Sequence, residues 1–422
     1  MSSHRKRYLD RQYAGKNTLS DLLFSDGKAL HTPREIAQQP WTWRQTGALM
    51  SRHAPELQAF LQKAGLYNKG NRPSLILTGA GTSDYVGLSL VDLLRNRFAT
   101  HCHNWSTTRI TVSPDVYFTA NHNHVLIHFA RSGNSPESTA VLDMALRHFP
   151  NVTHHLVITC NKDGELARIA DEHPDKVYSI VLDESTNDKG LAMTSSFSNL
   201  VLAGQALVHL SDMDHFQDLV ERMAGAAEYF INTYCDQIYD LASPELTRAF
   251  YLGNNELLGA AVESALKVQE LTRGRLMAKG EDTMAFRHGP VSAVDSHTLV
   301  CFFLSADAFT LQYELDVLYQ FSRPFQEMGT KTVVVSAGSQ KNDRENEDYI
   351  HHITFDPEAG FNIPKLYQVN IQILFGQLFG LFSAHRRGIH IDDPTSGDHP
   401  LYSRTVKGVR LYDYLLNDKS QI

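Results

Sequence analysis

The pattern of hydrophobic and polar positions divides most of the chain into short apolar runs and longer amphipathic segments. From residue 74, runs rich in β-branched residues are each followed by a polar turn and a stretch with apolar residues at helical spacing. This order predicts strands at SLILT, HVLIHFA, HLVITC and VYSIVLD, and a closing helix from Leu191 to about His209. Strands that alternate with helices in this way are typical of a parallel sheet covered on both faces.

A second round of the same order follows a helical segment at about 215–241. Its predicted strands are RAFYLG, HTLVCFFL, KTVVVSA and HHITFD, and its predicted helices lie at 254–272, 308–328 and 364–386. The repeated order indicates two copies of one unit. We therefore expect an α/β fold of two tandem doubly wound parallel-sheet domains of the flavodoxin-like type.

The segments outside the repeats set the expected domain limits. Before the first strand, Thr32, Pro33 and Glu35 have the spacing of a helix start, with Thr32 as the N-cap. We expect a helical N-terminal extension at 1–50, a first domain at 51–214, a second domain at 215–390 and a C-terminal tail at 391–422.

Composition narrows the class of protein. The chain has 422 residues, enough for two or three domains, and two is our working number. Its net charge of -8 leaves no global basic field for binding nucleic acid. The four cysteines are widely spaced and form no CxxC pair, which is typical of reduced thiols. The N-terminus lacks an apolar signal core and no run approaches about 18 apolar residues, so we expect a cytoplasmic protein with no membrane partner.

Two hydroxyl-rich loops follow neighbouring predicted strands. The sequence RSGNSPES places Ser132 and Ser135 before a helix whose first turn contains Pro136, and GAGTSDY places Thr82 and Ser83 after the preceding strand. Small residues at a helix N-terminus expose backbone N–H groups at the positive end of the helix dipole, which suits a phosphate. The alternative is that Ser132 and Ser135 only cap the helix.

Other ligand classes have weaker support. Asp84 occupies the third glycine position of a dinucleotide fingerprint, and the chain has no GxxxxGK[ST] loop, so we expect no cofactor. A metal enzyme remains an alternative because histidines occur in pairs, but these pairs lack accompanying carboxylate motifs and we expect no metal site. The pairs are His101/His103, His122/His124, His154/His155 and His351/His352.

A group of candidate acid–base residues lies in the second repeat. Glu263, Lys267 and Glu270 are four and three residues apart, so they project from one side of the predicted helix. His288 precedes a Gly-Pro turn and can exchange protons near neutral pH. The alternatives are an exposed ion-pair stripe and a solvated loop histidine. We assign the opposite side of the helix to the core, with Leu258, Ala261, Val262, Ala265 and Leu266.

Together these motifs resemble a known family. The loops GAGTS and ARSGNSPES, the segment GLAMTSSFSN and the run ESALKVQELTRG followed by FRHGP are similar to the double-domain sugar isomerase (SIS) family. Within that family, TPREIAQQPW, MAFRHGP and IDDPTSGDHPLYSRTVKGV resemble the galactosamine-6-phosphate deaminase/isomerases, formerly called tagatose-6-phosphate ketose/aldose isomerases. The resemblance extends from about residue 40 to the C-terminus.

The resemblance implies a role for each candidate residue. Glu270 matches the carboxylate that moves a proton between C1 and C2, Lys267 a neighbouring lysine, and His288 a ring-opening histidine that reaches in from the partner subunit. The implied phosphate contacts are Thr82, Ser83, Ser132 and Ser135. Arg131 departs from the family's pattern, and we expect it to add a charge-assisted contact to the phosphate. We expect the remainder of the pocket to contain Gly81, Thr194, Glu263 and Arg404. Arg404 stands where relatives have a Schiff-base lysine, and a guanidinium cannot form that link.

The resemblance also implies an activity and partners. We expect a homodimer with shared active sites that converts galactosamine 6-phosphate to tagatose 6-phosphate and ammonia by C1/C2 proton transfer, without metal or cofactor. Two alternatives stay open: aldose–ketose isomerisation of a hexose 6-phosphate without deamination, and a non-catalytic regulator that binds a sugar phosphate.

Overall fold

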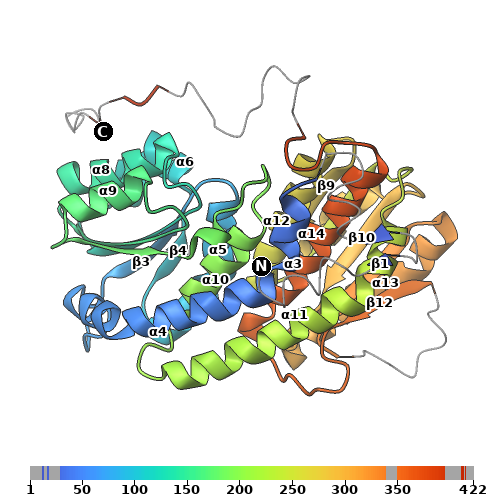
Figure 1. The fold of residues 1–422 in the computed structure, drawn as a ribbon, viewed down its shortest axis with the longest axis horizontal. Helices are drawn as coiled ribbons and strands as arrows, with labels where there is room; N and C mark the ends of the chain where they lie inside the picture. The colour runs from blue at the N-terminus through green and yellow to red at the C-terminus, as the bar shows by residue number, and fades with distance from the viewer. Residues whose placement is uncertain are drawn as a thin grey trace.

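The protein is described here by a computed structural model that covers residues 29–338, 349–394, 410–412 and 414, with the backbone of 12–13 and 17–18 as a short hairpin. Two five-stranded parallel sheets form its two halves (Figure 1). The first contains β3 (Ser74–Thr78), β4 (Cys102–Asn104), β5 (His124–Ala130), β6 (Val152–Thr159) and β7 (Val177–Val181); the second contains β8 (Arg248–Leu252), β9 (Met277–Glu281), β10 (Thr298–Phe303), β11 (Lys331–Ser336) and β12 (Ile350–Thr354).

The strand order is the same in both sheets. It runs β4-β3-β5-β6-β7 in the first and β9-β8-β10-β11-β12 in the second, so each half has the order 2-1-3-4-5. This is the flavodoxin-like order, and it confirms the predicted pair of doubly wound α/β units. The edge strands β4 and β9 were not predicted, because CHN and MAKGE are short and largely polar.

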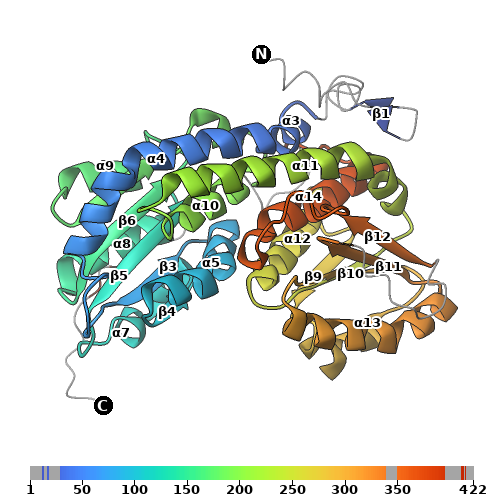
Figure 2. The ribbon, with the colours of Figure 1, turned by 90° about the horizontal axis from the view of Figure 1, so that it is seen from below.

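Helices cover both faces of each sheet (Figures 1 and 2). In the first half α8 and α9 cover one face, and α4, α5 and α10 cover the other. The helices are α3 (Thr32–Ala37), α4 (Gln39–Lys63), α5 (Thr82–Phe98), α6 (Thr107–Val112), α7 (Pro114–Tyr117), α8 (Pro136–His148), α9 (Glu165–Glu172), α10 (Ser195–Ala206), α11 (Met213–Leu241), α12 (Glu256–Thr272), α13 (Ala308–Met328) and α14 (Val369–Arg386), with short 3-10 turns at η1 (Glu184–Thr186), η2 (Ala285–His288), η3 (Pro290–Ala293) and η4 (Lys365–Tyr367).

Two long helices join the halves. Figure 2 shows α4 and α11 side by side along the molecule, where α4 also packs on α10 and α11 packs on α14. Residue 50, where we placed the boundary between the extension and the first domain, lies inside α4. Thr32, our predicted N-cap, lies inside α3; its hydroxyl donates instead to Asp392 Oδ1 at 2.9 Å.

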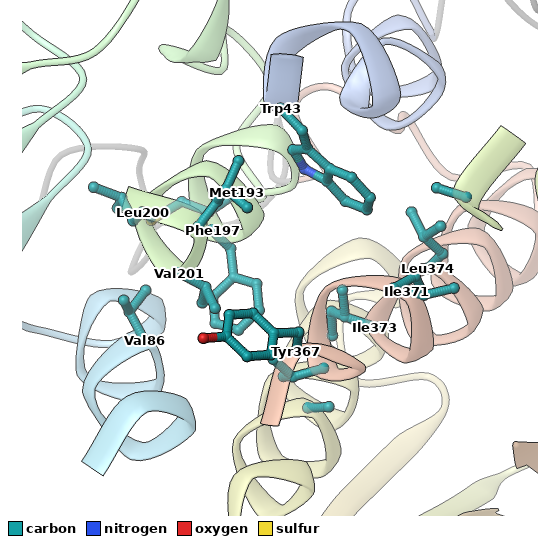
Figure 3. Close-up of a cluster of buried hydrophobic side chains, with 14 of the residues drawn as sticks. Trp43, Val86, Met193, Phe197, Leu200, Val201, Tyr367, Ile371, Ile373 and Leu374 are labelled. Carbon is teal, nitrogen blue, oxygen red and sulfur yellow. The ribbon is translucent and has the colours of Figure 1, made fainter. Parts of the chain in front are cut away.

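The interior between the halves is a single apolar cluster. It includes Leu77 and Phe129 from the first sheet and Phe303 and Val335 from the second. Figure 3 shows the middle of this cluster, where Trp43 of α4 lies near α10 and α14. Burial of large side chains on both sides of the junction fixes the two halves against each other, at roughly 25 cal/mol per Å² of apolar surface.

Close helix packing at the junction determines where α12 lies. Gly376 of α14 faces Ser264 of α12 so closely that a Cβ at residue 376 would lie 2.3 Å from the Ser264 Cβ and 2.8 Å from its Cα. Gly376→Ala is therefore expected to push the helices apart and lower the free energy of unfolding by about 1–3 kcal/mol, although alanine favours helix.

Urea denaturation measures this effect. Gly360→Ala is the matched control, because a Cβ there meets nothing within 4 Å and the substitution should be nearly neutral. A Gly376→Ala protein as stable as the wild type would show that the α12–α14 contact tolerates an added methyl group.

Candidate active site

A cavity of about 460 Å³ lies where the strand order of the first sheet reverses, beyond the carboxyl ends of β3 and β5. Ligands of doubly wound sheets bind at such switch points. The three segments singled out from the sequence all reach this cavity: the loop before α5, the loop before α8, and Glu270 of α12. The lining residues are Ala80, Gly81, Thr82, Ser83, Thr108, Phe129, Ala130, Arg131, Ser132, Gly133, Asn134, Ser135, Pro136, Glu137, Ser138, Leu191, Met193, Leu266 and Glu270.

The loop between β3 and α5 places Thr82 and Ser83 at the start of the helix. Gly81 has φ 57° and ψ −126°, a backbone conformation that disfavours side chains, and it turns the chain sharply into α5. In the second half, Asn255 has φ 52° and ψ −125° at the same place before α12. The two repeats thus share the turn as well as the strand order, and only the first repeat uses glycine there.

The loop between β5 and α8 caps a helix and also lines the cavity. Ser135 is the N-cap of α8: its Oγ accepts from the Ser138 N–H at 3.4 Å and donates to the Ser138 Oγ at 2.6 Å. Ser132, Ser135 and Ser138 all line the cavity. Helix capping and a cavity-lining position therefore occur in the same residue, and the first turn of α8 lines the cavity through Pro136, Glu137 and Ser138.

Arg131 connects this loop to another wall of the cavity. Its Nη1 donates to the carbonyl oxygens of Gly190 and Leu191, at 3.1 and 3.0 Å. Both Arg131 and Leu191 line the cavity. A guanidinium beside hydroxyls and a helix N-terminus forms a positive, hydrogen-bonding corner that suits an oxyanion.

Glu263 and Lys267 of α12 are buried, so the alternative interpretation as an exposed ion-pair stripe is wrong. The Lys267 Nζ donates to Glu270 Oε2 at 2.6 Å and to the Thr82 Oγ1 at 3.1 Å, and it lies 3.2 Å from Glu263 Oε1. The Lys267 and Glu263 side chains are 0% exposed, and Glu270, at 17%, is the member that reaches the cavity. Because Thr82 belongs to the first half, the group joins the two halves at the site.

Burial sets the electrostatics of this group. Desolvation raises the pKa of Glu263 to about 8, although the neighbouring Lys267 ammonium acts to lower it. For Lys267, burial acts to lower the pKa, but the Glu263 and Glu270 carboxylates outweigh it and raise the pKa above its usual value. Lys267 therefore stays cationic at neutral pH. It lies beside the Glu263 carboxyl, whose raised pKa favours the protonated form, and beside the Glu270 carboxyl at the cavity.

Two other predicted residues, His288 and Thr194, do not line the cavity. His288 is exposed at the end of η2 and does not line the cavity within one chain. Thr194 is fully buried at the start of α10, where its N–H donates to Asp188 Oδ2 at 2.7 Å. Arg404 lies outside the described residues.

Several lining residues were not predicted from the sequence, including Thr108, Ser138, Leu191 and Met193. Ser138 could have been included, because it continues the hydroxyl cluster of RSGNSPES. Leu191 and Met193 gave no polar signal, since apolar side chains in a pocket have the same pattern as core residues. The core face that we assigned to α12 was also partly wrong: Leu266 faces the cavity, whereas the fully buried face contains Leu257, Ala260, Ser264 and Val268.

The described part of the chain contains no group of three or more His, Cys, Asp and Glu side chains arranged to hold a metal ion. His124 and His155, each a member of one of the histidine pairs, are buried in the neighbouring strands β5 and β6, and His155 Nδ1 lies 3.2 Å from His128 Nε2. None of the described helices is long and apolar enough to cross a bilayer.

No family model matches this chain. Individual known proteins, however, are similar to it over nearly its whole length. The D-galactosamine-6-phosphate deaminase AgaS of Escherichia coli O157:H7 is 32% identical over 91% of this chain and 96% of its own length. A relative in Streptomyces coelicolor with the same name, given provisionally, is 34% identical over 93% and 97%.

Solved structures agree with these relatives. The tagatose-6-phosphate ketose/aldose isomerase of Escherichia coli matches with a TM-score of 0.77 and 31% identity, covering 91% of this chain and 97% of its own. A Clostridium novyi protein provisionally given the same name matches with a TM-score of 0.86 and 30% identity, covering 96% of this chain and all of its own. The C-terminal domain of a Francisella tularensis glucosamine-fructose-6-phosphate aminotransferase, at 15% identity, shares the fold with a TM-score of 0.71.

Proposed function

We propose that this chain, which belongs to the family of D-galactosamine-6-phosphate deaminases of the AgaS type, converts galactosamine 6-phosphate to tagatose 6-phosphate and ammonia. Membership of this family makes it a sugar-phosphate deaminase/isomerase, as the sequence resemblance implied. One observation supports the proposed reaction most strongly. Glu270 lines the same cavity as residues Ser132–Ser138, where we place the substrate's phosphate.

The phosphate anchors the substrate. In this proposal its oxygens accept hydrogen bonds from the N–H groups at the start of α8 and from the hydroxyls of Thr82, Ser83, Ser132 and Ser135, with Arg131 adding charge. A cavity of about 460 Å³ is large enough for a hexose phosphate, with C1 and C2 of the sugar away from the Ser132–Ser135 loop. The apolar side chains of Leu191 and Met193 exclude water from one wall.

Proton transfer is assigned to Glu270. In the open-chain amino sugar the aldehyde acidifies the C2 proton, which Glu270 removes and returns at C1. Lys267 donates a hydrogen bond to Glu270 and stabilises the enediol-type oxygen through its positive charge. As the C1 oxygen takes up a proton and the amino nitrogen gives one up, the product is a 2-imine with a C1 hydroxyl. Water then adds to the C2 carbon of the imine and ammonia leaves, which gives the ketose 6-phosphate. No lysine imine is required, and Glu263 holds Lys267 in place.

We also propose that a second copy of the chain supplies His288 for ring opening. This is supported by the exposure of His288 within one chain and by its place beside the Gly289–Pro290 turn. The enzyme is thus proposed to be a homodimer with shared sites, working in the cytoplasm, where phosphorylated sugars are retained by their charge. Mixing inactive Glu270→Gln and inactive His288→Ala chains should restore activity in the mixed dimers.

An ammonia-release assay tests the proposed function. The substrates are galactosamine 6-phosphate, glucosamine 6-phosphate and galactose 6-phosphate, with ketose 6-phosphate and ammonia measured in parallel. Equal amounts of ammonia and ketose from galactosamine 6-phosphate support the deaminase. Ketose from galactose 6-phosphate without turnover of the amino sugar would support plain isomerisation, and binding without product would support a regulator.

Substitution of Ser135 tests whether the phosphate loop binds the substrate. Ser135→Ala should raise KM about 10-fold with little change in kcat, because the hydroxyl would bind ground and transition state alike. It should also cost about 1 kcal/mol of stability through the lost cap. Asp307→Ala is the matched control: Asp307 caps α13 at the equivalent place in the second repeat, and its loss should lower stability and leave KM unchanged. An unchanged KM for Ser135→Ala would remove Ser135 from phosphate binding.

A further inference from the structure

One wall of the cavity is an irregular segment between η1 and α10, residues 188–194, which lies outside both sheets. Leu191 and Met193 face the cavity from it, and the Gly190 and Leu191 carbonyls accept from Arg131. The position of the Arg131 guanidinium therefore depends on how this segment is held. The backbone of the segment is in turn bound by acidic residues from three different parts of the chain.

Glu35 of α3 binds backbone groups of the segment that Arg131 does not contact. Its Oε1 accepts from the N–H of Lys189 at 2.5 Å and from the N–H of Gly190 at 3.2 Å. A Cβ at residue 190 would lie 2.5 Å from the Thr32 Oγ1 and 3.0 Å from the Glu35 Oε2, so α3 packs directly on the backbone of this segment. The N–H groups at 189–190 face Glu35, and the carbonyl groups at 190–191 face Arg131.

Two further acidic residues complete the support. Asp392 accepts from the N–H groups of His31 and Thr32, at 2.9 and 2.8 Å, and its backbone carbonyl accepts from the Leu191 N–H at 2.8 Å. Asp188 accepts from the N–H groups of Thr194 and Ser196, at 2.7 and 2.9 Å. Asp392 and Asp188 thus fix α3 and the end of the segment, while the Glu35 side chain binds its middle through residues 189 and 190.

The position of Glu35 is electrostatically unfavourable for a charged carboxylate. It is 6% exposed, and burial first and the Asp188 carboxylate second raise its pKa to about 8. A buried carboxyl near two others does not gain stability from its charge, and a group of this kind beside a cavity is a candidate for a functional role.

We propose that Glu35 is a positioning residue for substrate binding: it fixes the Gly190 and Leu191 carbonyls, and these direct the Arg131 guanidinium at the substrate's phosphate. The N-terminal helix α3 is then part of the active site although it contributes no lining residue. The inference rests on the proposed function only in naming a sugar phosphate as the anion.

A double-mutant cycle between residues 35 and 131 tests this role. Glu35→Leu removes both acceptors at similar volume and should weaken binding of galactosamine 6-phosphate about 10-fold, with kcat nearly unchanged. Arg131→Ala should weaken binding at least as much, and Glu35→Leu should have no further effect in that background. Glu35→Gln keeps one acceptor and should restore binding to within about 3-fold of the wild type.

Controls separate this role from a merely structural one. Glu184→Gln removes a carboxylate from the turn just before the segment, where Glu184 is 65% exposed and bonds the Lys189 side chain, so KM should not change. A general loss of folded protein would lower the active fraction and leave KM unchanged in every background. Should Glu35→Leu not fold, Glu35→Asp shortens the reach by one methylene and enters the same cycle.

Calorimetric titration with inorganic phosphate separates the inference from the proposed function, because phosphate needs only the anion site. Phosphate binding that depends on Glu35 and Arg131, without galactosamine 6-phosphate binding, would support the inference and contradict the function. Phosphate binding that is unaffected by Glu35→Leu, or weakened equally with and without Arg131, would overturn the inference. A wild-type protein that binds neither compound would contradict both.

Discussion

Glu270→Gln is expected to lower ammonia release from galactosamine 6-phosphate by about 10²–10⁴-fold, the usual contribution of general acid–base catalysis. The amide has the shape of the carboxyl and can still accept from Lys267, but it cannot take the C2 proton. KM should stay within about 3-fold, because the phosphate contacts are untouched. Initial rates over a range of substrate concentrations, with the melting temperature of the same samples, measure both effects.

Glu137→Gln is the matched control for Glu270→Gln. Glu137 also lines the cavity, on α8, but it lies in the first turn of that helix beside the proposed phosphate position. Its loss should change kcat far less. Turnover by Glu270→Gln at the wild-type rate would exclude Glu270 as the base and leave the identity of the proton carrier open to Glu137.

Lys267→Met is expected to have the largest effect on stability. The substitution removes a fully buried cation that contacts Glu263, Glu270 and Thr82, and breaking a buried pair on one side costs about 3–5 kcal/mol. It should also lower kcat by at least about 10²-fold, since the base loses its neighbouring charge. Urea denaturation and initial rates measure the two losses.

The loss of stability in Lys267→Met should depend on pH. Glu263 has a folded pKa of about 8, above its unfolded value of 4.5, so the stability linked to its proton is complete below 4.5 and is lost as pH rises through 8. Without Lys267 the two carboxyls have no cation, so the variant should lose more stability than the wild type between about pH 5 and 9.

Two comparisons test the cause of that pH dependence. Adding Glu263→Gln to Lys267→Met should recover part of the stability and flatten the dependence on pH. Lys189→Met, which breaks an ion pair with side chains 50% and 65% exposed, should change stability by less than about 1 kcal/mol. Equal losses at both ends of that pH range in Lys267→Met would show that the titration of Glu263 is not coupled to Lys267.

The fold was largely predictable because local pattern and tertiary structure agree in it. Most central strands are buried apolar runs followed by a described helix, so the hydrophobic period and the order of the elements were enough to predict two parallel sheets. The strands β4 and β9 escaped detection because edge strands bury one side only and tolerate polar residues such as His103 and Lys279.

The site was predictable where it consists of polar residues in loops and on one helix face. Ser132, Ser135, Thr82 and Glu270 combine polar side chains with positions at strand ends, and the switch point brings them together. The burial of Lys267 was not predictable, because a Glu-Lys spacing of four residues has the same pattern on a surface and in an interior.

The support of the site was not predictable. Glu35 stands in the first turn of a helix, where an acidic residue is expected for local reasons, and nothing nearby in the sequence indicates that it binds residues 189 and 190. Asp392 likewise contacts α3 across 360 residues of chain. Contacts of such separation follow from the packing of the whole fold, and only coordinates reveal them.

The most direct test of the central claim is a crystal structure of Glu270→Gln with galactosamine 6-phosphate. The account predicts the phosphate against Ser132–Ser135 and the N-terminus of α8, with the side-chain amide introduced at residue 270 about 3–3.5 Å from C2, the separation of a reacting pair. A sugar phosphate bound outside this cavity, or bound in it with C1 and C2 turned away from residue 270, would contradict the account.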